Sequence, residues 1–164
     1  MRQRRPSNRV ALARMVKWSK LVLRDKPMNM VHSPKAGITR DDIAQLVGAF
    51  YPRVRADARL GPIFEGRIGT SDAIWAKHMT TIGDFWANVM LRERAYKGNP
   101  LQVHLGIPEI EESDFARWLD LFEATARHEL GDEKADVFNT LARRIGRSLW
   151  MGIDMQRNPL APRS

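Results

Sequence analysis

The segment that decides the fold is Asn99-Pro100-Leu101-Gln102-Val103-His104-Leu105-Gly106-Ile107-Pro108. Asn99 is a good N-cap, and proline suits the first helical position, where a missing N–H costs nothing. Gly106 and Pro108 both end helices. The sequence therefore predicts a helix of one to two turns, from Leu101 to Leu105, between two longer helical patterns.

The most informative residue of this short helix is His104. A helix this short contributes little stability, so its visible use is to hold one imidazole among apolar neighbours (Leu101, Val103, Leu105 and Ile107). A five-coordinate haem iron needs one neutral imidazole and apolar walls around a flat macrocycle. Spacing alone leaves open a second interpretation, in which His104 is a hydrogen-bonded or exposed histidine in a loop.

Upstream, the chain is predicted to turn helical from Ile38. Thr39 and Asp42 have the spacing of a capping box, and an acidic side chain suits a helix N-terminus. Pro52 lies inside this helix and predicts a kink near Gly48. The apolar face has spacings of three and four residues, and consists of Ile43, Leu46, Val47, Phe50, Tyr51 and Val54.

The next segment, Leu60-Gly61-Pro62-Ile63-Phe64, is expected to be a turn with two large apolar side chains. A second long helix is then expected to start at Thr70, Ser71 or Asp72. Its apolar face again has helical spacing, and consists of Trp75, His78, Met79, Ile82, Phe85, Trp86 and Val89.

Downstream of the short helix, Ser113 is expected to cap a helix that ends at Gly131, with Phe115, Trp118, Leu119, Phe122 and Ala126 facing inward. Asp132 begins the last helix, with Val137, Leu141, Ile145 and Leu149 inward. Residues 153–164 look unstructured. No run of β-branched residues bounded by turns predicts a strand. The fold class predicted is all-α, with four substantial helices and one short helix.

Composition excludes several classes of site. The 164 residues include no cysteine, which removes thiolate-ligated zinc, iron–sulfur clusters, disulfides and covalent haem attachment. The net charge of +8 suggests nucleic-acid binding at first. However, residues 1–36 hold ten Lys or Arg and one acid, which leaves seventeen basic and eighteen acidic residues in 37–164. A near-neutral domain is not expected to wrap a phosphate backbone, so no nucleic-acid partner is predicted.

No stretch is apolar enough to span a membrane, and we expect a cytoplasmic protein.

Residues 1–36 are expected to form a separate basic extension. Ala11, Met15, Trp18 and Val22 fall on one helical face and basic residues on another, a pattern typical of helices that lie on anionic membranes and of transit peptides. The more ordinary interpretations, which we favour here, are a disordered tail or an over-extended start in which Met28 or Met30 is the real first residue. The expected domain boundaries are thus 1–36, 37–152 and 153–164.

Three polar residues lie on the apolar helix faces: Tyr51, His78 and Trp118. Each has an ordinary interpretation, because a buried tyrosine can bond a backbone carbonyl and a buried histidine or tryptophan is common in a core. Their other interpretation is a set of donors that reach into one cavity. Six aromatic residues would line the meeting faces and suit a planar porphyrin or a plain bundle core: Phe64, Phe85, Trp86, Phe115, Trp118 and Phe122.

Four strings of residues, in order and without large gaps, resemble the group III truncated haemoglobins over about residues 38–152. They are Phe50-Tyr51-x-x-Val54-Arg55-x-Asp57; Leu60-Gly61-Pro62-Ile63-Phe64; Ile68-Gly69-Thr70-Ser71-Asp72-x-x-Trp75-x-x-His78-x-x-x-Ile82-Gly83-x-Phe85-Trp86; and Tyr96-x-Gly98-x-Pro100-Leu101-x-x-His104-Leu105 with Phe115-x-x-Trp118-Leu119-x-Leu121-Phe122. Each string is weak alone, and the set is highly specific.

The resemblance implies a short globin of two helix pairs, stacked two over two around a non-covalent haem b (iron protoporphyrin IX). It implies that His104 is the proximal iron ligand and that Tyr51, His78 and Trp118 lie on the distal, gas-binding side. Pro52 and the basic extension depart from the family pattern, and Pro52 in particular puts the direction of Tyr51 in question. The haem pocket implied by the resemblance consists of Phe64, Ile82, Phe85, Trp86, Tyr96, Leu101 and Phe115, with Tyr96 near a propionate.

The function implied is binding of oxygen, nitric oxide or similar diatomic ligands, retained by hydrogen-bond donors. Nitric oxide dioxygenation or peroxide reduction would also need a separate reductase, because no flavin or nicotinamide motif is seen. The alternative is a haem-free helical interaction domain with a membrane-associating tail, and haem absorption separates the two.

Overall fold

The computed structural model describes residues 37–159, and every regular element in that range is an α-helix. The helices are α2 (Arg40–Ala56), α3 (Leu60–Ile68), α4 (Asp72–Leu91), α5 (Pro100–Leu105) and α6 (Glu112–Arg157). The all-α prediction is confirmed. Among residues 37–159, no helix combines the length and apolar character that a membrane crossing requires. The predictions for residues 1–36 lie outside the described residues.

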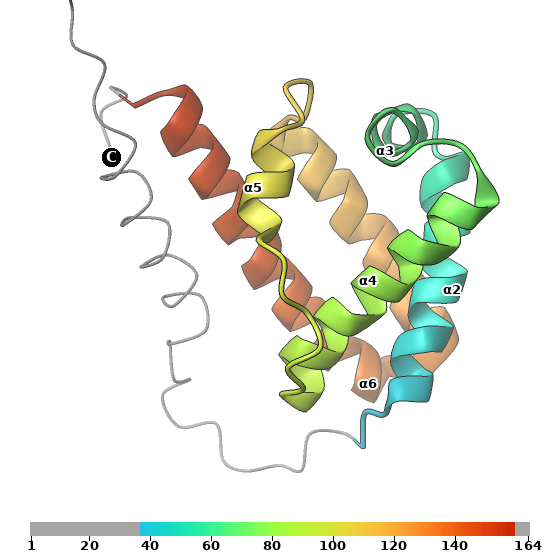
Figure 1. Cartoon of the computed structure of the whole chain (residues 1–164). Helices are drawn as coiled ribbons and strands as arrows, with labels where there is room; N and C mark the ends of the chain where they lie inside the picture. The colour runs from blue at the N-terminus through green and yellow to red at the C-terminus, as the bar shows by residue number, and fades with distance from the viewer. Residues whose placement is uncertain (1–36, 160–164) are drawn as a thin grey trace, which may run out of the picture. The chain divides into compact units, whose positions relative to one another are not determined.

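Two helix pairs make up the framework (Figure 1). Helix α2 packs against α4 and also against α6, and the two halves of α6 form the other pair because they meet at a sharp bend. The short helix α5 packs on α6, and α3 packs on α2 and α4. This arrangement agrees with the two-over-two stacking that the sequence resemblance implied.

The start of α2 follows the sequence prediction. The backbone N–H of Asp42 donates to Thr39 Oγ1 at 3.2 Å, and the backbone N–H of Thr39 donates to Asp42 Oδ2 at 2.8 Å, which completes the capping box. Lys134 Nζ of α6 donates to both carboxylate oxygens of Asp42, at 2.8 and 2.9 Å. The same carboxylate thus caps one helix and joins it to another.

Pro52 does not divide α2, which is continuous from Arg40 to Ala56. The proline removes the N–H that would bond the carbonyl of Gly48. Both Pro52 and Gly48 are exposed, so water can solvate that carbonyl. Tyr51 remains on the buried face of the helix, 4% exposed, so the proline that was expected to kink the helix near Gly48 does not turn this side chain out of the core.

The expected turn at residues 60–64 is wrong, because these residues are the first half of helix α3. Asp57 Oδ1 accepts hydrogen bonds from the backbone N–H groups of Arg59 and Leu60, at 3.0 and 2.9 Å, and so supports the helix start. A Cβ atom at Gly61 would lie 2.5 Å from the carbonyl oxygen of Arg55, so only glycine permits this close approach. Gly61 therefore allows a tight junction between α2 and α3.

The expected fourth and fifth helices meet at Gly131 without a loop, as α6. Gly131 has φ 75° and ψ 168°, a conformation nearly restricted to glycine, so the predicted break is correct. The N-cap is Glu111, which forms a capping box with Asp114, and not Ser113 as predicted. The helix also runs past 152 to Arg157, and Ile153 is fully buried, so the expected unstructured tail from residue 153 is wrong.

An aromatic cluster forms the centre of the core. The ring of Phe122 on α6 stacks between Trp86 and Trp118, with centroid distances of 5.3 and 4.9 Å and interplanar angles of 14° and 11°. Phe50 of α2 presents its edge to Trp118 and Phe122 at 5.0 and 5.2 Å. Because this packing joins α2, α4 and α6, the side chains that these helices present beside it are held in fixed orientations.

Candidate functional site

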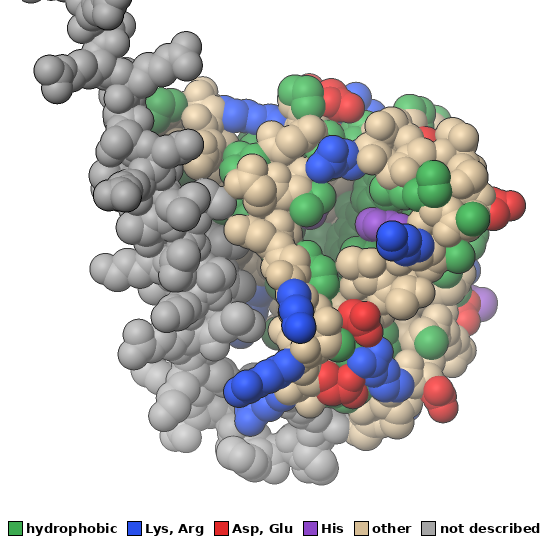
Figure 2. Space-filling view, in the orientation of Figure 1, with side chains coloured by type: hydrophobic (Ala, Val, Ile, Leu, Met, Phe, Trp, Pro, Cys, Tyr) green, Lys and Arg blue, Asp and Glu red, His purple; other side chains and the backbone are tan. Residues whose placement is uncertain are grey.

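A cavity of about 620 Å³ lies between the helices and opens to solvent. Figure 2 shows the hollow, with hydrophobic side chains inside it and a histidine and basic side chains at its edge. Its volume falls within the range of ~300–1,000 Å³ that is typical of small-molecule and cofactor sites. The residues that line it come from α2, α3, α4, α5, α6 and the α4–α5 and α5–α6 connections, and most are apolar.

Helix α5 presents His104 to this cavity. The predicted caps are confirmed: Asn99 Oδ1 accepts from the backbone N–H of Gln102 at 3.2 Å, Pro100 occupies the first turn, and Gly106 is the C-cap. Within the helix, His104 Nδ1 lies 2.7 Å from the carbonyl oxygen of Pro100. A carbonyl only accepts, so Nδ1 carries the proton and donates, and Nε2 keeps its lone pair.

Burial lowers the pKa of His104, and the bond to the Pro100 carbonyl offsets part of this effect. The imidazole is therefore neutral at neutral pH, with one nitrogen held by the backbone and the other available as a ligand. An imidazole bonded in this way has a fixed tautomer and ring orientation, as metal-binding histidines usually have.

Tyr51 of α2 and His78 of α4 lie next to each other at the cavity, with ring centroids 5.5 Å apart and planes at 90°. Burial raises the pKa of Tyr51 and lowers the pKa of His78, so both side chains are neutral near pH 7. The Nε2 atom of His78 is buried and has no hydrogen-bond partner within residues 37–159. A buried polar atom without a partner costs stability unless a ligand or a water compensates it.

Trp118 of α6 also lines the cavity, and no group within the described residues accepts a hydrogen bond from its indole N–H. Trp75 differs, because its Nε1 donates to the carbonyl of Gly69 at 2.8 Å. The Trp75 indole is thereby a structural element at the start of α4. Trp118 has its ring fixed by Phe122 and its N–H unused, which leaves a donor free for a bound molecule.

Most of the predicted pocket residues do line this cavity: Tyr51, Phe64, His78, Ile82, Phe85, Trp86, Tyr96, His104, Phe115 and Trp118. Leu101 does not. It is buried against α6, where a Cβ atom at Gly152 would lie 2.7 Å from Leu101 Cδ1. Leu101 therefore anchors α5 on α6, and its predicted contact with a cofactor finds no support in this packing.

Sequence reasoning missed two cations at the cavity, Arg67 of α3 and Lys77 of α4. Neither forms an ion pair within residues 37–159, although most of the other arginines there do. Their positions in the sequence could have revealed them, because each lies next to a residue predicted at the pocket: Arg67 follows Phe64 by about one helical turn, and Lys77 directly precedes His78. Two apolar side chains nearby are unusually exposed, Ile74 at 48% and Val103 at 43%.

Comparison with known proteins identifies relatives. No family model matches the chain. It is 42% identical over 108 residues to the group 3 truncated haemoglobin of Campylobacter jejuni, a match that spans 66% of this chain and 85% of that protein. The crystal structure of the group III truncated haemoglobin from Campylobacter jejuni superposes with a TM-score of 0.69 at 38% identity, over 72% of this chain and 93% of the other.

Proposed function

The chain belongs to the group III truncated haemoglobins, and from this premise we propose that it binds haem b without a covalent link and that His104 is the proximal iron ligand. The function of the site is then the binding of oxygen, nitric oxide or similar diatomic molecules. The observation that carries the proposal is the setting of His104: a neutral imidazole that faces an apolar cavity with its Nδ1 donating to Pro100.

The residues present fit a haem group. The cavity has room for a flat ligand of cofactor size, its walls are largely apolar and aromatic, and it holds one fixed imidazole. Absence of cysteine agrees with a non-covalent group. The Nε2 atom of His78, which has no partner among the described residues 37–159, also agrees with a site that receives a polar or hydrogen-bonding ligand.

The distal side is formed by Tyr51, His78 and Trp118. Haem iron supplies a coordination position where a small diatomic ligand gains partial negative charge. The phenol, the imidazole and the indole of this chain each offer an N–H or O–H group to stabilise that charge, and their free atoms line the cavity. A hydrogen bond to a charged partner contributes about 1.5–3 kcal/mol. Three such donors favour retention of the ligand, which argues against bulk oxygen delivery.

Carboxylates of the haem propionates need polar or cationic partners at the open edge of the cavity. Arg67 and Lys77 have no competing ion pair in residues 37–159, so they are free for this role. Tyr96 lies beside Phe85, with ring centroids 5.4 Å apart, and its hydroxyl comes so close to Gly98 that a Cβ atom there would overlap it. We assign these three residues to the propionate edge.

Redox turnover, such as nitric oxide dioxygenation or peroxide reduction, is a second role for the same site. Either reaction requires electrons from a separate reductase. A protein purified with haem should be tested for nitric oxide consumption with and without an added reductase system. Consumption of more than one nitric oxide molecule per haem, seen only when the reductase is added, supports an enzyme. Consumption limited to one molecule per haem under both conditions supports a binding protein.

The direct test of the proposal is an absorption spectrum of protein reconstituted with haem. The wild-type protein should show an intense Soret band, and His104→Ala should lose haem readily or lack the band. The matched control is His128→Ala, because the side chain of His128 is 72% exposed and pairs with Glu129 away from the cavity. A colourless wild-type protein would instead support a haem-free helical domain.

A further inference from the structure

The connection between α5 and α6, residues 106–111, follows His104 directly and forms part of the cavity wall. Ile107 and Ile110 are both buried and line the cavity. The connection has few bonds of its own: the N–H groups of Gly106, Ile107 and Ile110 donate to the carbonyls of Val103, His104 and Ile107, respectively. A segment with so little local bonding needs contacts from elsewhere to keep one conformation.

One such contact comes from the far end of α6. Arg157 Nη1 donates to the carbonyl oxygen of Ile110 at 2.6 Å, and Arg157 Nη2 donates to that of Ile107 at 2.8 Å. Within residues 37–159 this guanidinium forms no ion pair with a carboxylate. The Arg157 guanidinium thus holds two backbone carbonyls of the connection, those of Ile107 and Ile110, whose side chains line the cavity.

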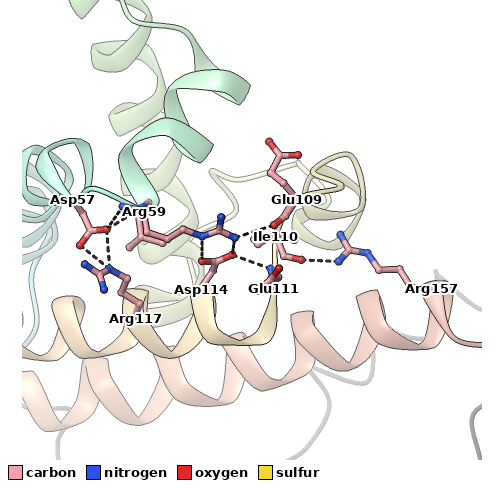
Figure 3. A network of polar contacts seen from close by, with 9 residues as sticks. Asp57, Arg59, Glu109, Ile110, Glu111, Asp114, Arg117 and Arg157 are labelled. Atoms are coloured by element: carbon pink, nitrogen blue, oxygen red, sulfur yellow. Dashed lines mark hydrogen bonds and ion pairs between the residues drawn. The ribbon is translucent and has the colours of Figure 1, made fainter.

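A second contact comes from the start of α3 (Figure 3). Arg59 Nε and Nη2 donate to Asp114 Oδ1 and Oδ2 at 2.7 and 2.8 Å, and Nη2 also lies 3.1 Å from the carbonyl oxygen of Glu109. The Asp114 side chain is 4% exposed and accepts from the backbone N–H of Glu111 at 2.9 Å. A bidentate pair of this kind fixes direction as well as distance.

The two contacts act on one segment. Two guanidinium groups, from the start of α3 and the end of α6, hold the carbonyls of residues 107, 109 and 110, and Asp114 holds the N–H of residue 111. We call Arg59, Asp114 and Arg157 the proximal clamp. The carbonyl of His104 accepts from the N–H of Ile107, so a shift of the clamped segment pulls on the residue that carries the imidazole.

We propose that the proximal clamp positions His104, so that it sets the strength and geometry of the bond between this imidazole and the iron. This inference rests on the proposed function. Arg59, Asp114 and Arg157 are positioning residues, because they act through the connection. Asp114 reaches the cavity wall, but its carboxylate is already engaged by Arg59 and Glu111. Hydrogen bonds to three backbone carbonyls restrict movement of the connection that directly follows α5.

The test compares Arg157→Met and Arg157→Lys with the matched control Arg147→Met in the full chain. Arg147 is exposed on the same helix and has no hydrogen bond or ion pair within residues 37–159. In haem-free protein, amide hydrogen exchange across residues 106–111 should become at least about tenfold faster in Arg157→Met, because three amides there depend on a fixed turn. Arg157→Lys keeps a donor and should show a smaller change.

In ferrous haem protein, resonance Raman spectroscopy reports the iron–histidine stretching band. Arg157→Met should shift or broaden this band and speed haem loss by about threefold or more, less than the ~10–100-fold that direct partners of a metal ligand can cost. Arg157→Lys should restore most of the band, and Arg147→Met should match wild type. If the band and the haem loss of Arg157→Met match those of Arg147→Met, the clamp has only a structural role and the inference fails.

The proposed function fails in a different way. Wild-type protein should show the iron–histidine band, and His104→Gly should abolish it. A missing band in the wild type would contradict the assignment of His104 itself, whereas a normal band that is insensitive to Arg157 contradicts the clamp alone.

Discussion

Replacement of Tyr51 by Phe removes one oxygen atom from the distal side and leaves the ring. The Tyr51 ring has neighbours on several sides, with centroids 5.1 Å from Phe50, 6.1 Å from Phe64 and 6.1 Å from Trp75. Phenylalanine keeps these contacts. The hydroxyl has no hydrogen-bond partner within residues 37–159, so its removal leaves no protein group unpaired. We therefore expect the free energy of unfolding to change by less than about 0.5 kcal/mol.

The effect on a bound ligand should be much larger. If the hydroxyl donates to a partially charged ligand, its loss removes about 1.5–3 kcal/mol, which corresponds to roughly a 10- to 150-fold faster release of oxygen. The range assumes that Tyr51 stays neutral, as it does because burial raises its pKa. Donors on His78 and Trp118 remain in the variant, so the measured value should lie toward the lower end.

The assay is stopped-flow displacement of oxygen by excess carbon monoxide, with Tyr96→Phe as the matched control. Tyr96 is half-buried at the cavity edge beside Phe85 and is assigned to a propionate, so its loss should change the release rate by less than about twofold. A release rate for Tyr51→Phe within twofold of wild type would refute the role of Tyr51 as the main donor. If oxygen release became equally faster in Tyr51→Phe and Tyr96→Phe, the effect would not depend on a hydroxyl beside the bound ligand.

Three further predictions concern the proximal ligand, pH and backbone conformation. His104→Ala, reconstituted with haem, should lose the Soret band that His128→Ala keeps, and retention of a normal band in both would exclude His104 as the ligand. The Arg117 guanidinium, 2.8 Å away, is the chief reason why the pKa of Asp57 is lowered to about 2. Because this pKa is lower in the folded state than the unfolded value of about 4, the charged carboxylate stabilises the protein at pH values above about 4. This contribution disappears as the pH falls toward 2. Thermal melts of wild type and Asp57→Asn should therefore differ at pH 6 and converge near pH 2, and a difference independent of pH would contradict this. Gly131→Ala should destabilise the protein by about 1–3 kcal/mol in urea titrations, because φ 75° and ψ 168° are nearly restricted to glycine; Gly48→Ala, in an exposed helical position with nothing within 4 Å of its Cβ, should instead stabilise it by about 0.5–1 kcal/mol, and equal effects would refute the reasoning.

The sequence predicted the features that depend on neighbouring residues. The capping box of Thr39 and Asp42, the N-cap at Asn99, the break at Gly131 and the helix class all follow from local hydrogen bonding and backbone preference. Where the sequence-based predictions of helix boundaries were wrong, the reason is physical. Residues 60–64 contain Gly and Pro, which usually indicate a turn, and here the glycine allows a close contact with the carbonyl of Arg55. Residues 153–164 looked unstructured, and the burial of Ile153 comes from packing that no local pattern shows.

Sequence patterns also placed most of the cavity residues correctly, because helical spacing decides which side of a helix a residue occupies. They could not distinguish residues by partner. Trp75 and Trp118 look alike in sequence. Only the structure shows that Trp75 donates to Gly69, whereas the N–H of Trp118, which lines the cavity, has no acceptor in the part of the chain that the structure describes. Leu101 was expected at the cavity, but it packs on Gly152. Helical spacing cannot predict this contact, because the two residues lie more than forty positions apart in the sequence.

The sequence by itself determined an all-α chain, a short capped helix that carries His104, and the apolar faces that surround it, since each is encoded within a few residues. Tertiary structure decided that a buried nitrogen of His78 has no partner among residues 37–159 and that Arg67 and Lys77 lie at the cavity. It also decided that Arg59 and Arg157 hold the segment after His104. These are contacts between residues distant along the chain, and which polar atom meets which depends on how whole helices pack.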